Sequence, residues 1–395
     1  MDASYFIARR IRFKRKIVSV SIAVSFLIMI MAVAISSGFR HEIRGGLSSV
    51  MGDIQLTPPD LNVLDESSPI ERNAAYLPSI EAMKEVETIM PVVYKAGIVK
   101  NGENIHGVLF KGVPSGAFNG LSSKDSISLP VSIPKPLAEI TSLKVGDRML
   151  AYFVGEKVRM RQFNVVSVHD VLLEADDNLI VMADLADMQR LLGWDDDQVS
   201  AVEISLGRSF KDERSIEAAK MNIGSLVSAY SYDSEYPVIA SSSVSKYPQI
   251  FDWLDLIDFN VFFILLLMTI VAGFNMISGL LIMLFENISM IGLLKSLGMT
   301  DRAIAKVFLS SSAVLVGKGM FWGNISALAF CLIQGTMHLI PLSPENYFVS
   351  YVPVYVNPGM ILIADIASFV VILLLLLIPC VFISKVDPAD TVRVR

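Results

Sequence analysis

Four long apolar segments alternate with polar stretches along the chain. They cover residues 17–37, 259–285, 307–337 and 358–383. Each segment is long enough to cross about 30 Å of hydrocarbon as a helix, since a helix rises about 1.5 Å per residue. The pattern predicts four transmembrane helices, one near the N-terminus and three close together near the C-terminus.

The first apolar segment has a second interpretation, as a cleaved signal peptide. Basic residues precede it, and the small residues Ala34, Ser36 and Ser37 stand at its end. Its apolar length of about 20 residues exceeds the roughly 7 to 15 that are usual in the core of a signal peptide. We therefore interpret the segment as a retained membrane anchor.

The long stretch between the first two spans, residues 38–258, has a different pattern. Short alternating runs typical of strands are separated by turn signals and a few helical stretches. The Asn101-Gly102 turn signal separates the runs 94–99 and 105–111, which predicts a β-hairpin. The region is expected to be an α+β domain, with two lobes divided near residue 120. Helices are expected within it at 79–89, in ADLADMQRLLGW (183–194), and at 213–230.

Net charge also distinguishes residues 38–258 from the rest of the chain. Residues 38–258 carry 20 Lys and Arg against 32 Asp and Glu, and the remaining residues carry 13 against 7. Lys and Arg flank the first and last spans and recur in the segment after the second span, whereas the loop after the third span has none. Short loops rich in Lys and Arg stay in the cytoplasm. The predicted cytoplasmic segments are 1–16, 286–306 and 384–395, and the predicted outer segments are 38–258 and 338–357.

The residues expected for catalysis, metal binding or nucleotide binding are missing. Both cysteines, Cys331 and Cys380, lie in predicted spans, so the outer domain cannot depend on disulfides. Its histidines lack metal-ligand spacing, and the acidic runs 174–177 and 195–197 lack the calcium-loop pattern. The Gly317-Lys318 pair is not part of a phosphate-binding loop. We therefore expect a non-enzymatic chain that binds no metal, no cofactor and no nucleic acid.

The segment ENISMIGLLKSLGMT, residues 286–300, separates the second and third spans. An apolar stripe at positions i, i+1, i+4 and i+7 predicts an amphipathic helix: Met290, Ile291, Leu294 and Leu297. Gly298 stands where a residue with positive φ commonly closes a helix. Such a helix can lie on lipid or dock into a groove of a partner. Docking is favoured because Lys295 is the single cation on its polar face.

Three polar side chains fall inside the predicted spans, namely Asn275, Lys318 and Asp365. Polar and ionisable groups are costly in lipid, and therefore mark functional positions by default. Lys318 and Asp365 can pair across the bundle, or each can extend to the nearer membrane surface. Asn275, with Gly273 and Gly279, indicates either close helix packing or a kink.

Five stretches, in this order of spans, resemble the FtsX/MacB-type permeases of ABC transporters, and among them the lipoprotein-releasing (Lol-type) subunits. The stretches are SSGFRHEIRGGL, VMADLADMQRLLG, VAGFNMISGLLIMLFEN with ISMIGLLKSLGMT, PENYFVSYVPV and KVDPADTVR. The resemblance covers nearly the whole chain. One departure lies in the predicted amphipathic helix of residues 286–300, where the family usually has more charged residues. Glu286 is kept here, but Asn287, Ser289 and Met290 occupy the following positions.

The resemblance implies an inner-membrane subunit with both termini in the cytoplasm and the 38–258 domain in the periplasm. A cytoplasmic ABC ATPase dimer would bind ATP and Mg²⁺. The other implied partners are a second permease subunit, identical or related, a lipoprotein substrate, a periplasmic lipoprotein carrier and membrane lipids. The residues implied to couple to the ATPase are Glu286, Met290, Ile291, Gly292, Leu294, Lys295, Leu297 and Gly298.

A lipoprotein substrate would bring acyl chains that must leave the bilayer. Burial of each CH₂ group is worth about 0.8 kcal/mol, so extraction is steeply uphill and needs an apolar cavity to receive the chains. By analogy with the family, we expect its walls in the first two spans, although the same residues can simply face lipid. They are Met29, Ile30, Val33, Phe262, Phe263 and Leu266.

Three other functions fit the same layout. The chain can be a MacB-like efflux permease for peptides or small molecules, or an FtsX-like signalling permease that activates a cell-wall hydrolase. Outside the superfamily, it can be a membrane-anchored sensor, which leaves the three C-terminal spans unexplained. The PENYFVSYVPV stretch and the short outer domain favour lipoprotein release.

Overall fold

The computed structural model describes residues 16–59, 61, 68–102, 104–117, 129–155, 158–170, 179–231 and 237–380. The chain divides into two compact units. The first contains the residues up to Glu42, 252–342 and those from Tyr351 onward, and the second contains Ile43–Phe251 with Ser343–Ser350. Four helices in the described residues are long and apolar enough to cross a membrane. The chain is therefore a four-span membrane protein with an α+β domain between the first and second spans, as predicted.

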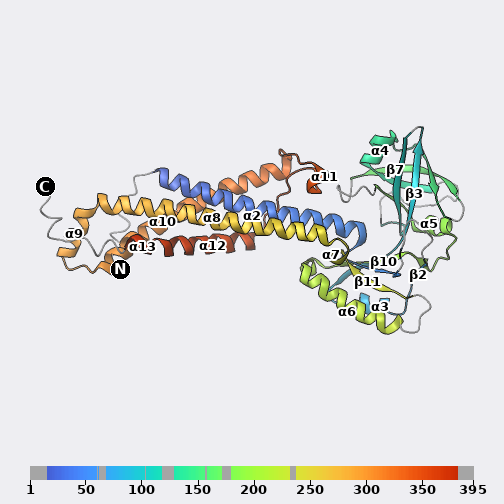
Figure 1. The fold of residues 1–395 in the computed structure, drawn as a ribbon, viewed down its shortest axis with the longest axis horizontal. Helices are drawn as coiled ribbons and strands as arrows, with labels where there is room; N and C mark the ends of the chain where they lie inside the picture. The colour runs from blue at the N-terminus through green and yellow to red at the C-terminus, as the bar shows by residue number, and fades with distance from the viewer. Residues whose placement is uncertain are drawn as a thin grey trace. The chain divides into compact units, whose positions relative to one another are not determined.

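The spanning helices lie side by side in a bundle (Figure 1). They are α2 (Lys16–Met51), α8 (Pro248–Glu286), α10 (Asp301–Met337) and α12 (Pro358–Leu375), which is followed by the short α13 (Leu377–Cys380). Glycines bring α10 close to α2: a Cβ at Gly323 would lie 2.5 Å from the carbonyl oxygen of Ala23. Small residues permit such close packing in lipid, where apolar burial alone does not drive helices together.

The helices extend beyond the predicted spans. Helix α2 continues 14 residues past position 37, to Met51, and α8 begins at Pro248 rather than at 259. At 36 and 39 residues, these helices are about 54 and 58 Å long, so both exceed the hydrocarbon thickness. Hydropathy locates the part of a helix that lies in lipid, but not its polar continuation. The predicted termini 1–15 and 384–395 and the acidic run 174–177 lie outside the described residues.

Two short helices lie in the loops between spans. Helix α9 (Ile288–Ser296) connects α8 to α10, and α11 (Pro344–Tyr347) lies in the loop between α10 and α12. An isolated β-bridge between Pro341 and Tyr351 closes the second loop at its base.

The outer domain contains the strands and the remaining helices. The strands are β1 (Ile54–Thr57), β2 (Ile70–Glu71), β3 (Val86–Asn101), β4 (Asn104–Val113), β5 (Leu129–Pro134), β6 (Arg148–Phe153), β7 (Arg159–His169), β8 (Leu179–Asp184), β9 (Gln198–Val199), β10 (Ala201–Leu206) and β11 (Ile239–Ser242). The helices are α3 (Leu77–Glu81), α4 (Lys135–Thr141), α5 (Leu185–Leu192), α6 (Glu213–Ser231) and α7 (Ser243–Lys246).

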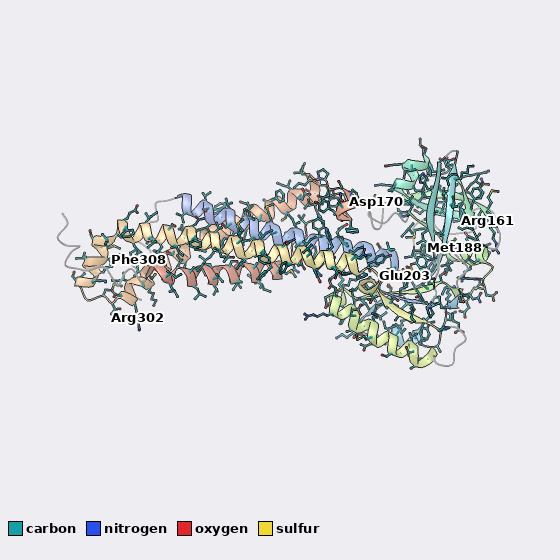
Figure 2. The ribbon with its side chains drawn as sticks, viewed as in Figure 1. Arg161, Asp170, Met188, Glu203, Arg302 and Phe308 are labelled. Atoms are coloured by element: carbon teal, nitrogen blue, oxygen red, sulfur yellow. The ribbon has the colours of Figure 1, made fainter. Side chains whose placement is uncertain are left out.

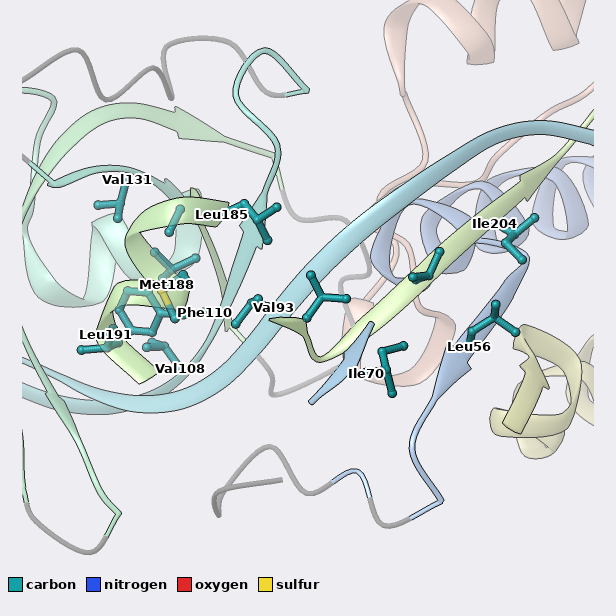
Figure 3. Close-up of a cluster of buried hydrophobic side chains, with 14 of the residues drawn as sticks. Leu56, Ile70, Val93, Val108, Phe110, Val131, Leu185, Met188, Leu191 and Ile204 are labelled. Carbon is teal, nitrogen blue, oxygen red and sulfur yellow. The ribbon is translucent and has the colours of Figure 1, made fainter. Parts of the chain in front are cut away.

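Strand β3 organises this domain because it belongs to two sheets. Its first half pairs with β10, in the order β11-β1-β10-β3. Its second half pairs with β4 on one side and with β6 on the other, which closes the ring β3-β4-β8-β5-β7-β6. One apolar core runs through both parts, from Leu56 and Ile204 to Phe110 and Met188 (Figure 3). The two parts thus share a strand and a core.

Local sequence explains several elements of the domain. The predicted hairpin is formed by β3 and β4, and Gly102 adopts a φ of +63° in its turn. The helix predicted in ADLADMQRLLGW is α5, where Asp184 accepts a hydrogen bond from Ala186 N at 2.9 Å. The predicted helix 79–89 is wrong beyond Glu81, because Val86–Val92 pairs with β10. Its β-branched residues suit a strand, and pairing overrides the helical pattern.

Candidate functional site

Helix α9 has well-defined ends. Asn287 Nδ2 donates to the carbonyl of Met283 at 2.8 Å where α8 ends. Gly298 has a φ of +87° after the last turn, and its amide donates to Lys295 O at 2.9 Å. Lys295 Nζ lies 2.9 Å from Asp301 Oδ1 at the start of α10. The predicted helix and its glycine terminator therefore form a compact corner between two spanning helices.

Three of the four residues in the apolar stripe predicted to dock a partner face the bundle instead; Leu297 does not. Ile291 is fully buried in a cluster that includes Leu280, Ile304 and Phe308, and Met290 and Leu294 pack against the same cluster. Phe308 is labelled in Figure 2 at the α9 end of α10. The assignment of Ile291 to an external surface is corrected: its side chain seats α9 on the bundle. Gly292 is buried as well.

A different face of this corner is exposed. Leu293 and Leu297 are 55% and 75% exposed, and Phe285, at the end of α8, is 67% exposed. Together with the exposed Ser289, these residues are spaced by four. We call Phe285, Ser289, Leu293 and Leu297 the exposed stripe. Phe285 and Leu293 are not among the residues predicted to dock a partner, although they belong with Ser289 and Leu297 to a series spaced by four.

At the other end of the bundle, the SSGFRHE stretch of α2 (36–42) binds to α8 through several side chains. The Arg40 guanidinium lies 2.7 Å from Asp255 and also pairs with Asp258. Ser36 donates a hydrogen bond to Asp258, and the Phe39 ring packs edge-to-face on Trp253 with centroids 5.7 Å apart. This face of α2 is thereby fixed to α8 by both charge and aromatic packing.

The outer loop lies against another face of the same α2 turns. Tyr355 N donates to the carbonyl of Ala34 at 3.0 Å, and the Tyr355 ring stacks on His41 with centroids 4.4 Å apart. A Cβ on Gly38 would overlap the Pro353 carbonyl, so only glycine allows this approach. We call Ser36, Gly38, Phe39, Arg40 and His41 the outer collar.

The polar group at Asn275 joins helices rather than producing a kink. Asn275 Nδ2 donates to Ser21 Oγ of α2 at 2.6 Å. One turn and a half earlier, Thr269 Oγ1 donates to Ser368 Oγ of α12 at 3.1 Å. Between them, a Cβ on Gly273 would lie 2.5 Å from a methyl of Leu375. Helix α8 is thus held closely to α2 and α12, as the packing interpretation predicted.

Lys318 and Asp365 do not pair. Asp365 is 6% exposed, and its Oδ2 accepts a hydrogen bond from Asn324 Nδ2 at 2.5 Å. Lys318 precedes Asn324 by six residues on α10, or about 9 Å along the helix axis, and its side chain is exposed. Of the two alternatives, pairing is therefore excluded, and the polar bond between α10 and α12 is made by an asparagine.

The six residues predicted to line one cavity lie on different surfaces. Met29, Ile30 and Val33 of α2 are buried among the helices. On α8, Val261 and Leu265 pack against the cluster that holds Ile30 and Val33. The remaining three predicted residues consequently point away from α2 and are 47–59% exposed: Phe262, Phe263 and Leu266. The predicted cavity is corrected, because its two halves do not meet.

The described residues contain no group of three or more His, Cys, Asp or Glu side chains arranged to hold a metal ion.

Comparison with known proteins connects these features to a family. Residues 262–388, which contain the exposed stripe, match the family described as FtsX-like permease C-terminal. The chain is 24% identical to the lipoprotein-releasing system transmembrane protein LolC of Neisseria meningitidis, over 94% of this chain and 92% of the relative. It is 22% identical to the LolC of Xylella fastidiosa with the same coverage. It is also 22% identical to the LolE of Haemophilus influenzae, over 95% and 93%.

Solved structures of outer domains are more distantly similar. The extracellular domain of the ABC-type transporter YknZ from Gram-positive bacteria has 11% identity and a TM-score of 0.31, covering 48% of this chain and 99% of that domain. The periplasmic region of MacB from Actinobacillus actinomycetemcomitans has 10% identity and a TM-score of 0.33, covering 51% and 95%. These scores are too low to support an argument about the fold.

The assignment therefore depends on the family model, on relatives that match almost end to end, and on the order of one span, an outer domain and three spans. Together these findings support a Lol-type ABC permease of the FtsX/MacB-like superfamily.

Proposed function

We propose that the chain is the membrane subunit of an ATP-driven transporter that takes lipoproteins from the outer leaflet of the inner membrane toward the outer membrane. The observation that carries this proposal is its similarity, over 94% of the chain, to a protein named as a lipoprotein-releasing system transmembrane protein. ATP and Mg²⁺ would bind to a partner ABC ATPase. This chain would supply no catalytic group.

The proposed orientation places α9 and both termini in the cytoplasm and the outer domain in the periplasm. Lys295, Arg302 and Lys306 surround the α9 corner, whereas the loop 338–357 contains no Lys or Arg. Short loops rich in basic residues are retained in the cytoplasm, which supports this orientation. The exposed stripe would then face the ATPase, and the outer collar would lie at the periplasmic side of the bundle.

The exposed stripe is the proposed docking surface for the ATPase. Ile291 is anchored in the bundle core, so a force on Leu293 or Leu297 would move α8 and α10 together rather than rotate α9 freely. Protein interiors are close-packed, and therefore transmit displacements instead of absorbing them. Closure of the ATPase would in this way shift the spanning helices.

The outer collar would carry this movement outward. Arg40 and Ser36 fix α2 to α8, so the two helices would move as a pair. Each is one uninterrupted helix through this region: α2 continues to Met51, and α8 begins at Pro248. A continuous helix passes a displacement along its axis, because its backbone hydrogen bonds resist extension and bending. The outer domain would thus respond to ATP turnover.

Acyl chains would need an apolar surface while they leave the bilayer. Withdrawal of about 15 CH₂ groups costs roughly 12 kcal/mol if no such surface receives them. Helix α8 offers such a surface. Only 22% of its most apolar stretch is buried inside the structure, a smaller share than in the other three spans. On its exposed surface, the Phe263 ring contacts both Phe259 and Phe262. A second permease subunit, identical or related, would pack over this surface and enclose a cavity.

The test is affinity purification of the chain in mild detergent, followed by ATP-dependent lipoprotein release in proteoliposomes. Co-purification of an ABC ATPase with acylated lipoproteins, and release that requires ATP, are the expected results. Leu293→Asp and Leu297→Asp should abolish ATPase binding, because each places a charge in an apolar interface. Ser296→Asp is the matched control on the same helix. An ATPase that co-purifies with a cell-wall hydrolase and releases no lipoprotein would overturn the proposal.

A further inference from the structure

A buried polar cluster in the outer domain surrounds the last turn of α2. Lys111 of β4 and Glu203 of β10 are 1% and 2% exposed, and Lys111 Nζ lies 2.8 Å from Glu203 Oε1. Tyr94 of β3 donates to the Glu203 carboxylate and accepts from Gln55 Nε2 at 3.1 Å. We call Gln55, Tyr94, Lys111 and Glu203 the helix-end cluster. Glu203 is labelled in Figure 2.

Lys111 is bonded to the backbone of α2 as well as to Glu203. Its Nζ donates to the carbonyl of Val50 at 2.7 Å and to that of Ser49 at 3.3 Å. The helix ends at Met51, and Gly52 follows with a φ of +72°. The last carbonyls of a helix have no partner within it and form the negative end of its dipole. A buried ammonium group therefore caps the end of the first spanning helix.

The residues that follow the helix are bound to the same strands. Asp53 N donates to Ile204 O at 3.0 Å, and Asp53 Oδ2 accepts from Leu206 N at 2.7 Å. Gly52 lies so close to β10 that a Cβ would be 3.0 Å from Ile204 O. Tyr94 Oη, on β3, is 3.2 Å from Val50 O. The end of α2 is thus held from β3, β4 and β10 together.

Stability alone does not explain this cluster. Replacing a buried ion pair with apolar residues of similar volume is often neutral or stabilising, because two charges no longer have to be desolvated. Burial raises the pKa of Glu203, although the Lys111 charge opposes that shift. An apolar core would nevertheless leave the Val50 and Ser49 carbonyls without their ammonium donor. The particular contribution of the pair is a directional bond between the sheet and α2.

We infer that the helix-end cluster is the joint through which α2 moves the outer domain, with Lys111 as the positioning residue. This inference rests on the proposed function, in which α2 carries movement from the ATPase. Lys111 holds the helix end by hydrogen bonds that have a fixed direction, and Glu203 holds the Lys111 ammonium. A displacement of α2 is therefore passed to β4 and β10 instead of being lost in a loosely packed helix end.

The experiment uses the full chain, reconstituted in nanodiscs and proteoliposomes with its co-purified ATPase. Lys111→Met combined with Glu203→Leu removes the joint while keeping apolar volume in the core. The matched control, Asp187→Leu with Arg190→Met, removes an ion pair of α5 that belongs to the same domain and is not among the contacts of α2. Lipoprotein release per ATP hydrolysed, ATP turnover and amide hydrogen exchange are measured for each.

The double variant should release at least fivefold less lipoprotein per ATP, with unchanged ATP turnover. Amides 49–53 and 203–206 should exchange at least tenfold faster, while those of β5 and β7 keep their wild-type rates. The control should match wild type in release. Wild-type release per ATP in the double variant, or an equal loss in the control, would overturn the joint. Faster exchange throughout the domain would show unfolding and also count against it.

Failure of the proposed function is distinguishable from failure of the joint. If the wild-type complex hydrolyses ATP but releases no lipoprotein, the substrate assignment fails. The joint is then judged by exchange alone, with the ATPase trapped by vanadate. Trapping should change the exchange of 203–206 in wild type and in the control, and leave it unchanged in the double variant. The same response in all three chains would refute the joint.

Discussion

Replacing Gly38 with alanine tests the outer collar with a single methyl group. A Cβ at this position would overlap the Pro353 carbonyl and lie 2.8 Å from Val354 N, whereas ordinary contacts begin at about 3.4 Å. Both obstacles are backbone atoms, so no side-chain rotation relieves the overlap. The outer loop must move away from α2.

The cost follows from the contacts that this movement breaks. Overpacking by one methyl typically costs about 1–3 kcal/mol. Loss of the bond from Tyr355 N to Ala34 O adds about 1 kcal/mol. A total of roughly 2–4 kcal/mol corresponds to a roughly 30-fold to 1,000-fold larger fraction of open loop, since about 1.4 kcal/mol is tenfold. Glycine-to-alanine replacement in a helix is otherwise stabilising by roughly 0.5–1 kcal/mol.

The assay is hydrogen exchange of the amides of Val354 and Tyr355 in the full chain in nanodiscs. Gly45→Ala is the matched control, because Gly45 lies in the same helix and no atom is found within 4 Å of its Cβ position. Gly38→Ala should accelerate exchange at Tyr355 by at least 30-fold, and Gly45→Ala should not. Equal protection of Tyr355 in both variants would refute the collar geometry.

Three further predictions concern other contacts. Gly323→Leu should lower the melting temperature of the detergent-solubilised chain by several degrees, as measured by circular dichroism. The leucine side chain would clash with the backbone of α2 at Ala23. Asp365→Ala should destabilise the bundle by about 1–3 kcal/mol by leaving Asn324 without its partner, whereas the exposed Lys318→Gln should be neutral within about 0.5 kcal/mol in the same measurement. Burial lowers the pKa of His169, so its contribution to stability is complete above the unfolded pKa of about 6.5 and is lost as pH falls below that value. Amides of β5 and β7 should lose more protection between pH 7.5 and 5 in wild type than in His169→Gln, and equal losses would exclude the histidine.

Much of the fold was predictable because it depends on patterns local to the sequence. Four apolar segments gave four spanning helices, and Asn101-Gly102 gave the β3–β4 turn. An apolar run shows which part of a helix lies in lipid. The helix continues beyond that part wherever the following residues keep their helical backbone hydrogen bonds. That difference explains why α2 ends at Met51 rather than at residue 37.

The candidate site was less predictable because its residues are defined by contacts between helices. An amphipathic stripe shows that α9 has an apolar face, but not whether that face meets its own bundle or a partner. The bundle occupies the face of Ile291 and leaves Leu293 exposed. The partner of Asp365 also could not be read from the sequence. In the structure it is Asn324, and not Lys318, that donates a hydrogen bond to the carboxylate. The i, i+4 spacing of Gly319 and Gly323 is a sequence signal of the α2–α10 contact, because both glycines lie against α2.

The packing of α9 also decides what kind of docking surface remains. Lys295 is the single cation of the helix, and it is engaged by Asp301 with only 11% of its side chain exposed. The exposed stripe itself contains no charged side chain, so under the proposed docking its attraction to the ATPase would come from apolar burial. Leu293 and Leu297 are 55% and 75% exposed, so burying the rest of both side chains is worth roughly 2–4 kcal/mol, enough to change an affinity by about thirtyfold or more. Under the proposed docking, the affinity of the ATPase for this corner would therefore depend little on salt, because apolar burial is not screened as surface ion pairs are.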